Sequence, residues 1–202
     1  MLKCLNVNMI NIEQVKELRQ QTGVSISECQ NALEEANGDN EKAKEVLRKL
    51  GKDLANKKSS REAGNGIIKA YIHPNNKVGA MIELRCETDF VAKGDDFKEL
   101  AHEICLQITA MKPFFLSEEE IPEEIIESER KIYKAQMADS GKPEEILNQI
   151  IEGKLAKYKK EVSLLSQEWV KDNTKTIKNL IEEYVAKIGE NIVLKRFTRF
   201  EI

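Results

Sequence analysis

The spacing of apolar residues along this chain changes type, and that change limits the folds it can adopt. Within residues 12–50 apolar residues recur at helical spacing, whereas within 66–86 they alternate with polar residues, as in a half-buried strand. Helical spacing then returns, and alternation reappears at 191–202. The pattern predicts an α+β protein: a three-helix bundle, then a three-stranded antiparallel sheet packed with helices and a helical hairpin.

The amino-terminal segment is expected to hold three short helices. Thr22 and Gly23 end the first, and Ser25 with Glu28 three residues later is a capping box that begins the second. Gly51 is expected to end the third. A unit of this size is only marginally stable alone, so it is more typical of a docking module than of a catalytic domain.

These changes of pattern predict three regions. The bundle covers residues 1–51, and residues 52–63, with four basic residues and few large apolar ones, form a linker. An α+β core domain covers 64–202 and includes an antiparallel helical hairpin at about 121–160. In the hairpin, the first helix begins at Pro122 and runs to about Ser140, and residues 141–143 form the turn.

Each strand is expected to place its alternating apolar residues on one side. For the first strand these are Ile68, Ala70 and Ile72; for the second, Ala80, Ile82, Leu84 and Cys86; for the third, Ile192, Leu194, Phe200 and Ile202. The helix that follows the second strand has one apolar face made of Phe97, Leu100, Ala101, Ile104, Ile108 and Met111.

Charge and cysteine content exclude several classes of protein. With 32 basic and 35 acidic residues the net charge is -3, so no general field attracts nucleic acid, and no apolar run is long enough to span a membrane. Cys4, Cys29, Cys86 and Cys105 form no CxxC pair, which argues against a metal site and favours buried thiols in a reducing compartment. Without a signal-peptide pattern, the expected location is the cytoplasm.

No catalytic motif is present. The chain lacks a phosphate-binding loop, a GxSxG elbow, an HExxH zinc motif and a dinucleotide fingerprint, so we expect neither enzymatic activity nor a bound cofactor. The segment at 87–95 fits neither strand nor helix. Phe90 there is either partly exposed on a short connection or packed under the next helix as a staple, and the residue pattern alone slightly favours the staple.

Several motifs resemble those of the elongation factor Ts family. Residues 88–92 read TDFVA, a signature of that family, and VKELR at 15–19 with EANGD at 35–39 resembles its amino-terminal signature. SGKP at 140–143, EVSL at 161–164 and RFE at 199–201 resemble its carboxyl-terminal half. The resemblance therefore covers essentially the whole chain.

This resemblance implies a guanine-nucleotide exchange factor for the GTPase elongation factor Tu, with an amino-terminal bundle similar to ubiquitin-associated domains. The residues implied beside the partner's Mg²⁺ site are Thr88, Asp89, Phe90, Val91 and Ala92, together with Gln107, which stands where some members carry a His. The residues implied in docking of the bundle are Arg19, Thr22, Gly23, Ile26 and Ser27. No metal, nucleic acid or membrane is implied for the factor itself.

The chain departs from the family pattern in two ways. Ile26–Ser27 and Gln30–Asn31 replace a Met pair and a Lys pair, so the amino-terminal contact is expected to be retuned. Only one core repeat is present, as in short members, which implies a homodimer that completes the core. The alternative hypothesis is a protein–protein interaction module without exchange activity.

Overall fold

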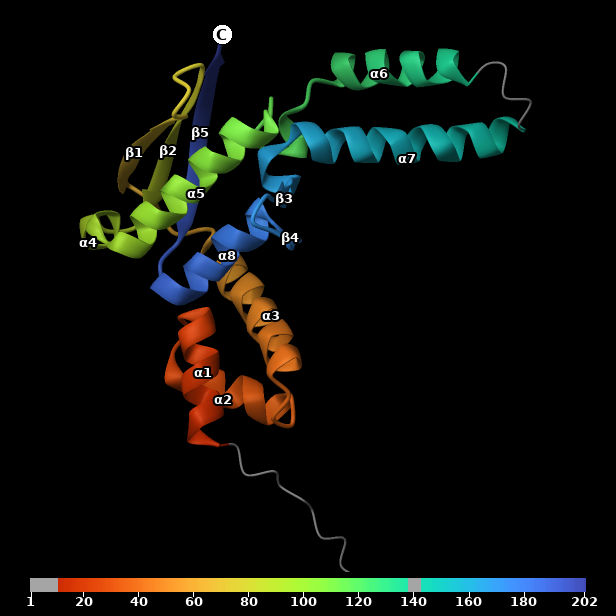
Figure 1. The fold of residues 1–202 in the computed structure, drawn as a ribbon. Coiled ribbons are helices and arrows are strands. Elements are labelled where there is room, and N and C mark those ends of the chain that lie inside the picture. Colours follow the sequence, from red (N-terminus) through yellow and green to blue (C-terminus); the bar gives the residue numbers. More distant parts are fainter. Residues whose placement is uncertain (1–10, 138–142) are drawn as a thin grey trace, which may run out of the picture. The chain divides into compact units, whose positions relative to one another are not determined.

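The computed structural model describes residues 11–137 and 143–202, and its α+β architecture confirms the predicted fold class (Figure 1). The chain packs into two compact units that are not consecutive segments. Among the described residues, unit 1 comprises 11–67, 84–100 and 181–194; unit 2 comprises 68–83, 101–137, 143–180 and 195–202. The predicted division into a bundle at 1–51 and a core at 64–202 stays a prediction.

The three-helix bundle belongs to unit 1. Helices α1 (Ile12–Thr22), α2 (Ile26–Glu35) and α3 (Asn40–Lys58) begin at the caps Asn11, Ser25 and Asp39. Their shared core consists of Val15, Leu18, Val24, Cys29, Ala32, Leu33, Ala36, Ala43 and Leu47. The Ser25 cap differs from the expected box, because the Glu28 carboxylate accepts the Ser25 hydroxyl at 2.7 Å.

Helix α3 does not end at Gly51, so that part of the prediction is wrong. It continues to Lys58 and takes in half of the predicted linker. Gly51 is buried, and a Cβ there would lie 3.4 Å from the carbonyl oxygen of Glu182 in α8 (Ile177–Ile188). Gly51 therefore serves close helix packing in unit 1 and not helix termination.

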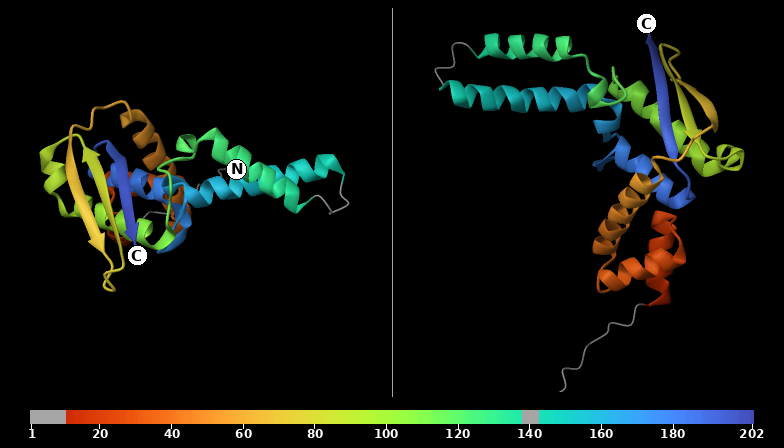
Figure 2. Two further views of the ribbon diagram at one scale, coloured as in Figure 1. Left: turned by 90° about the horizontal axis from the view of Figure 1, so that it is seen from above. Right: turned by 180° about the vertical axis from the view of Figure 1, so that it is seen from behind.

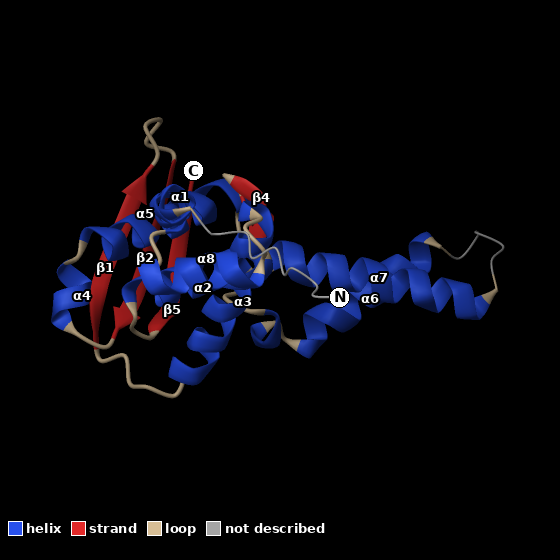
Figure 3. Ribbon diagram, turned by 90° about the horizontal axis from the view of Figure 1, so that it is seen from below, coloured by secondary structure: helices blue, strands red, loops and turns tan. Residues whose placement is uncertain are grey.

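The main sheet is antiparallel, with strands β1 (Asn65–Ile72), β2 (Val78–Cys86) and β5 (Ile192–Glu201) in the order β1-β2-β5 (Figure 3). The predicted inner face of β2 is confirmed, since Ala80, Ile82, Leu84 and Cys86 are all buried.

The predicted shared side of Ile68, Ala70 and Ile72 in β1 is confirmed, because all three are exposed. That side is the open face of the sheet, where Ile68 is 62% and Ile72 67% exposed. The predicted shared side of the apolar residues in β5 is wrong. In β5, Ile192 and Leu194 are buried, but Phe200 and Ile202 are exposed. Lys195 and Arg196 are both exposed although they are consecutive, so the alternation is interrupted between the buried and exposed halves.

The segment after β2 forms a short helix, α4 (Asp89–Lys93), followed by α5 (Asp95–Met111). In unit 2, α5 packs on the sheet: the Cys105 thiol donates to the Lys69 carbonyl oxygen, and Arg199 donates to that of Thr109. The predicted apolar face of α5 is buried except for Met111, which is 47% exposed at the helix end.

The predicted helical hairpin is present in unit 2. Helices α6 (Glu123–Gln136) and α7 (Glu144–Val162) lie side by side in every view (Figures 1 and 2). Ile121, Ile126, Ile151, Leu155 and Val162 form its core. Arg130 of α6 is hydrogen-bonded to Glu152 of α7, an ion pair between the arms. The predicted end of α6 at Ser140 and most of the turn lie outside the described residues.

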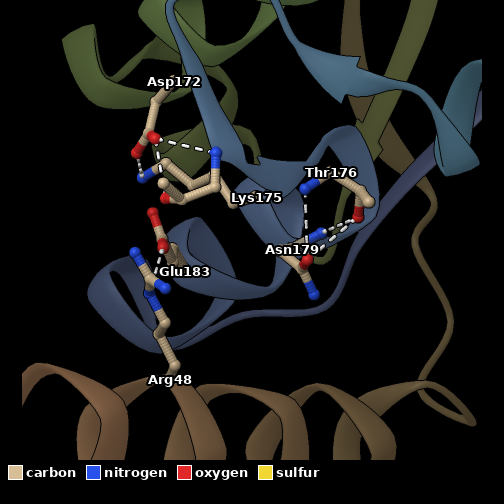
Figure 4. A network of polar contacts seen from close by, with 7 residues as sticks. Arg48, Asp172, Lys175, Thr176, Asn179 and Glu183 are labelled. Atoms are coloured by element: carbon tan, nitrogen blue, oxygen red, sulfur yellow. Dashed lines mark hydrogen bonds and ion pairs between the residues drawn. The ribbon is translucent and has the colours of Figure 1, made fainter.

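A second, two-stranded sheet was not predicted. Strands β3 (Glu168–Trp169) and β4 (Asp172–Thr176) pair antiparallel after the one-turn helix η2 (Leu164–Ser166); a similar turn, η1 (Glu118–Glu120), precedes α6. Thr176 then caps α8: its Oγ accepts the Asn179 N–H at 3.2 Å, and Asn179 accepts the Thr176 N–H at 3.1 Å (Figure 4).

Candidate partner-binding site

Phe90 in the TDFVA segment (residues 88–92) projects into solvent. It is 83% exposed, so of the two alternatives for Phe90 the exposed one is correct and the staple is wrong. The buried aromatic here is Phe97, in the first turn of α5. Asp89 beside it is exposed as well. Ala92 is buried and Val91 is half-buried, so these two residues anchor α4 to unit 1 while Asp89 and Phe90 remain free for contact.

Thr88 is the residue that fixes the start of α4. Its Oγ accepts the N–H of Val91 at 3.3 Å, and its carbonyl oxygen accepts the N–H of Ala92. The Cys86 thiol donates to the same carbonyl at 3.1 Å. Burial is the main cause that raises the pKa of Cys86 to about 11, so the thiol keeps the proton that it donates.

Glu190, in the turn between α8 and β5, holds Thr88 from the other side. One carboxylate oxygen accepts the N–H of Glu87 at 3.1 Å and that of Thr88 at 3.0 Å, and the other accepts the Thr88 hydroxyl at 2.6 Å. All these residues belong to unit 1.

Asp89 carries a full negative charge at neutral pH. Its carboxylate accepts a hydrogen bond from Lys93 at 2.7 Å, and this bond is the largest cause that lowers the pKa of Asp89. Both side chains lie on the surface, so the pair is easily exchanged for another partner. The segment therefore presents an aromatic ring next to an ionised carboxylate.

The bundle has a groove of about 710 Å³ between α1 and α2. We call it the bundle groove. Its lining residues are Ile12, Val15, Lys16, Arg19, Gln20, Gly23, Ile26 and Gln30. Three residues implied in docking, Arg19, Gly23 and Ile26, thus line one surface. Ile26 is 56% exposed, so its apolar side chain is accessible to a partner at this surface.

Gly23 makes the turn between α1 and α2. Its φ of 69° is left-handed, and its N–H donates to the Arg19 carbonyl oxygen at 2.7 Å, which closes α1. The aliphatic part of Lys187 lies over it, because a Cβ on Gly23 would stand 2.7 Å from Lys187 Cε. Thr22 is half-buried, with its hydroxyl bonded to the Leu18 carbonyl oxygen, while Ser27 is exposed.

Gln107 lies in the interior of unit 2, apart from any exposed surface. Its side chain is fully buried, and its amide donates to the side chain of Gln167 at 3.2 Å and to the carbonyl of Glu168 at 3.0 Å. Its oxygen accepts the N–H of Val170 at 3.0 Å. Every bond of this amide is internal, so in this conformation Gln107 presents no polar atom to a partner.

Sequence reasoning missed Glu190, Lys187 and Gln167. No local pattern links residue 190 to residue 88, since the two meet only when the third strand returns beside the second. A glycine followed by Glu190 and Asn191 at a helix end indicates a turn, but it gives no sign of a carboxylate that bonds a distant backbone.

Within 11–137 and 143–202, no group of three His, Cys, Asp or Glu side chains is placed to bind a metal ion, and no helix is long and apolar enough to cross a membrane. Cys29, Cys86 and Cys105 are buried, as predicted, while Cys4 lies outside the described residues.

Known proteins are similar in sequence to this chain over nearly its whole length. A family model described as "Elongation factor TS" matches residues 7–185. Elongation factor Ts of Thermotoga maritima is 50% identical over 193 residues, which are 96% of each chain. Elongation factor Ts of Thermosipho melanesiensis is 50% identical over 194 residues, 96% of this chain and 99% of that one. Elongation factor Ts of Caldanaerobacter subterraneus is 48% identical over 193 residues, again 96% of each chain. A match of this extent shows that the chain belongs to the elongation factor Ts family of translation elongation factors.

Proposed function

We propose that this protein binds elongation factor Tu in its GDP-bound state and promotes release of the GDP during translation elongation. Family membership supports this partner. The observation that carries the mechanism is Phe90, a large aromatic side chain that is 83% exposed on a capped helix. Exposure alone is not distinctive, because Phe114 and Phe200 are 75% and 73% exposed. What supports Phe90 as the contact residue is exposure within the TDFVA motif, beside the ionised Asp89.

The physical basis of exchange is displacement of the partner's metal. GDP in such GTPases is held by backbone amides and by a Mg²⁺ ion that demands near-ideal octahedral geometry. A ring wedged beside that site need move its neighbours only slightly to spoil this geometry. The Asp89 carboxylate adds a negative charge that competes for the groups around the ion and the phosphates.

The bundle groove is the second contact that we propose. Its apolar floor with Arg19 and Ile26 at the surface is suited to a helix of the GTPase. Ser27 extends this surface, and Thr22 supports it from within. We leave Gln107 out of the direct contact because its amide is fully used inside unit 2, and we assign it a supporting role instead.

Exchange of this kind needs no covalent chemistry, and GDP and Mg²⁺ belong to the partner. The coupling is reciprocal: if the factor weakens GDP binding, GDP weakens binding of the factor by the same amount. The protein would thus speed exchange without deciding which nucleotide is bound. Its place of action would be the cytoplasm, where translation elongation occurs.

We further propose that two copies pair through the open face of the sheet. Ile68, Ile72 and Met81 are exposed there, and a groove of about 400 Å³ runs beside them. A second copy would cover these apolar side chains.

Light scattering over a dilution series should give a dimer mass for the natural chain and a monomer mass for Ile72→Lys. A monomer for the natural chain at high micromolar concentration would contradict pairing.

The decisive experiment is release of fluorescent GDP from elongation factor Tu with catalytic amounts of the factor. Burying a phenyl ring removes about 150–250 Å² from water, several kcal/mol at roughly 25 cal/mol per Å². Association costs offset part of this, so Phe90→Ala should lose about 1–3 kcal/mol, roughly ten- to a hundredfold in exchange efficiency.

Phe114→Ala is the matched control, because Phe114 is another exposed phenylalanine, 75% accessible, outside the TDFVA segment. Both variants should melt at nearly the temperature of the natural chain. Unchanged GDP release by Phe90→Ala would remove the wedge mechanism. A stable complex with elongation factor Tu but no effect on GDP release would instead indicate an interaction module without exchange activity.

A further inference from the structure

We propose that Glu190 is a positioning residue for exchange: its carboxylate holds Thr88 so that Phe90 projects in the direction that the partner requires. This inference rests on the proposed exchange function. It adds to the residues needed for exchange one that lies 102 positions after Thr88 in the chain.

The Glu190 carboxylate is used almost completely by the start of the TDFVA segment. It accepts three hydrogen bonds, from the N–H groups of Glu87 and Thr88 and from the Thr88 hydroxyl, at 3.1, 3.0 and 2.6 Å. These two N–H groups belong to the residues between the end of β2 at Cys86 and the start of α4 at Asp89. A charged acceptor forms stronger hydrogen bonds than a neutral one, so Glu190 continues the pairing of β2 beyond its end.

A hydrogen bond in the opposite direction also joins the segment at 87–88 to the turn at 190–191. Glu87 accepts the N–H of Asn191 at 2.7 Å with its carboxylate, and its carbonyl oxygen accepts the side-chain amide of Asn65 at 2.8 Å. Residues 87–88 and 190–191 therefore exchange side-chain to backbone bonds reciprocally. The position of Thr88 is thus determined by the turn after α8 as well as by the strand that precedes it.

The Thr88 hydroxyl transmits this position to the helix. Because it donates its proton to Glu190, its lone pairs are free to accept the N–H of Val91 and so cap α4. A helix of five residues is far too short to be stable without such support. Phe90 lies in the first turn after this cap, so a shift of Thr88 would swing the exposed ring.

The test compares Glu190→Ala, Glu190→Gln and Thr88→Val, each alone and in a Phe90→Ala background. GDP release measures function, and hydrogen–deuterium exchange of the amides of Glu87, Thr88 and Val91 measures the position of the segment in the free protein. Glu120→Ala is the matched control, since the Glu120 carboxylate accepts one backbone N–H, that of Leu116, at another helix start.

Glu190→Ala should expose these amides to faster exchange and slow GDP release roughly tenfold, with Thr88→Val intermediate. Glu190→Gln, whose amide oxygen can still accept the two N–H groups, should retain most of the activity. In the Phe90→Ala background the same changes should cost less than about twofold further, because a positioning residue has no effect once the group it positions is gone. Glu120→Ala should behave as the natural chain.

Three results would overturn the proposal. Glu190→Ala with faster amide exchange but normal GDP release would separate Glu190 from function, and the Phe90 mechanism would stand. An equal loss with and without Phe90 would indicate a general structural role. Normal GDP release by Phe90→Ala would refute the exchange mechanism itself, and the role of Glu190 with it.

Discussion

Gly51 of α3 lies against Ala186 of α8, where a Cβ on the glycine would stand 3.6 Å from the alanine Cβ. The two helices approach closely because neither residue has a larger side chain. This contact explains why α3 runs through a glycine without ending. It also packs the bundle against the same helix whose last turn leads to Glu190, within unit 1.

Gly51→Ala should be tolerated, because its Cβ would make ordinary van der Waals contacts, the shortest at 3.4 Å. Helix propensity then favours alanine, and we expect a gain of up to about 1 kcal/mol in the free energy of unfolding. Gly51→Leu should instead lose about 1–3 kcal/mol by overpacking. Chemical denaturation measures both.

Gly153→Ala is the control for propensity alone, since nothing lies within 4 Å of a Cβ at that position in α7. It should stabilise by about the same amount as Gly51→Ala. A loss of stability for Gly51→Ala alongside a gain for Gly153→Ala would mean that α3 and α8 pack more tightly than described.

Replacement of Gln107 by leucine should be strongly destabilising. The change leaves the buried side-chain oxygen of Gln167 and the N–H of Val170 without their partner. Unsatisfied buried groups cost about 1–3 kcal/mol each, so we expect a loss of about 2–4 kcal/mol. Gln149→Leu, at an exposed position of α7, should change stability by less than about 0.5 kcal/mol. If Gln107→Leu changed stability as little as Gln149→Leu, the hydrogen bonds of the Gln107 amide would not contribute to the stability of the fold.

The described cysteines should be unreactive in the folded protein. Burial raises the pKa of Cys86 and of Cys105 to about 11 and also raises that of Cys29, so almost no thiolate exists at pH 8. In a Cys4→Ser variant, iodoacetamide should label none of the three thiols before unfolding and all of them in guanidinium chloride. Rapid labelling of the native variant would show that one of these sites opens.

Glu201 should titrate at unusually low pH. Its carboxylate accepts hydrogen bonds from Arg199 and Lys112, which lower its pKa from 4.5 to about 2. Because the folded pKa is the lower one, the stabilisation is present above pH 4.5 and is lost as the pH falls towards 2. Solvent and salt screen the interactions of Glu201 with Arg199 and Lys112, so their effect on the free energy of unfolding is small. NMR titration at low salt should show the midpoint, and Lys112→Ala should raise it.

Secondary structure was largely predictable because it depends on neighbours in sequence. The change from helical to alternating spacing located the bundle, the strands and the hairpin, and the cap at Ser25 begins a helix where expected. The strands β3 and β4 were missed, because β3 has only two residues and β4, with the sequence DNTKT, has no apolar residue that could alternate. The predicted helix end at Gly51 was wrong, because a glycine that terminates a helix and a glycine that allows close packing of a second helix look the same in the sequence.

What the sequence determined by itself was the order of elements, the buried face of β2 and, through its motifs, the family. The tertiary structure alone decided that Ile68 and Ile72 face solvent, that Phe90 is exposed and that Gln107 is buried. It also brought Glu190 to Thr88. Local spacing is set by residues a few positions apart, whereas exposure and long-range hydrogen bonds depend on which segments meet, and no pattern within one segment records that.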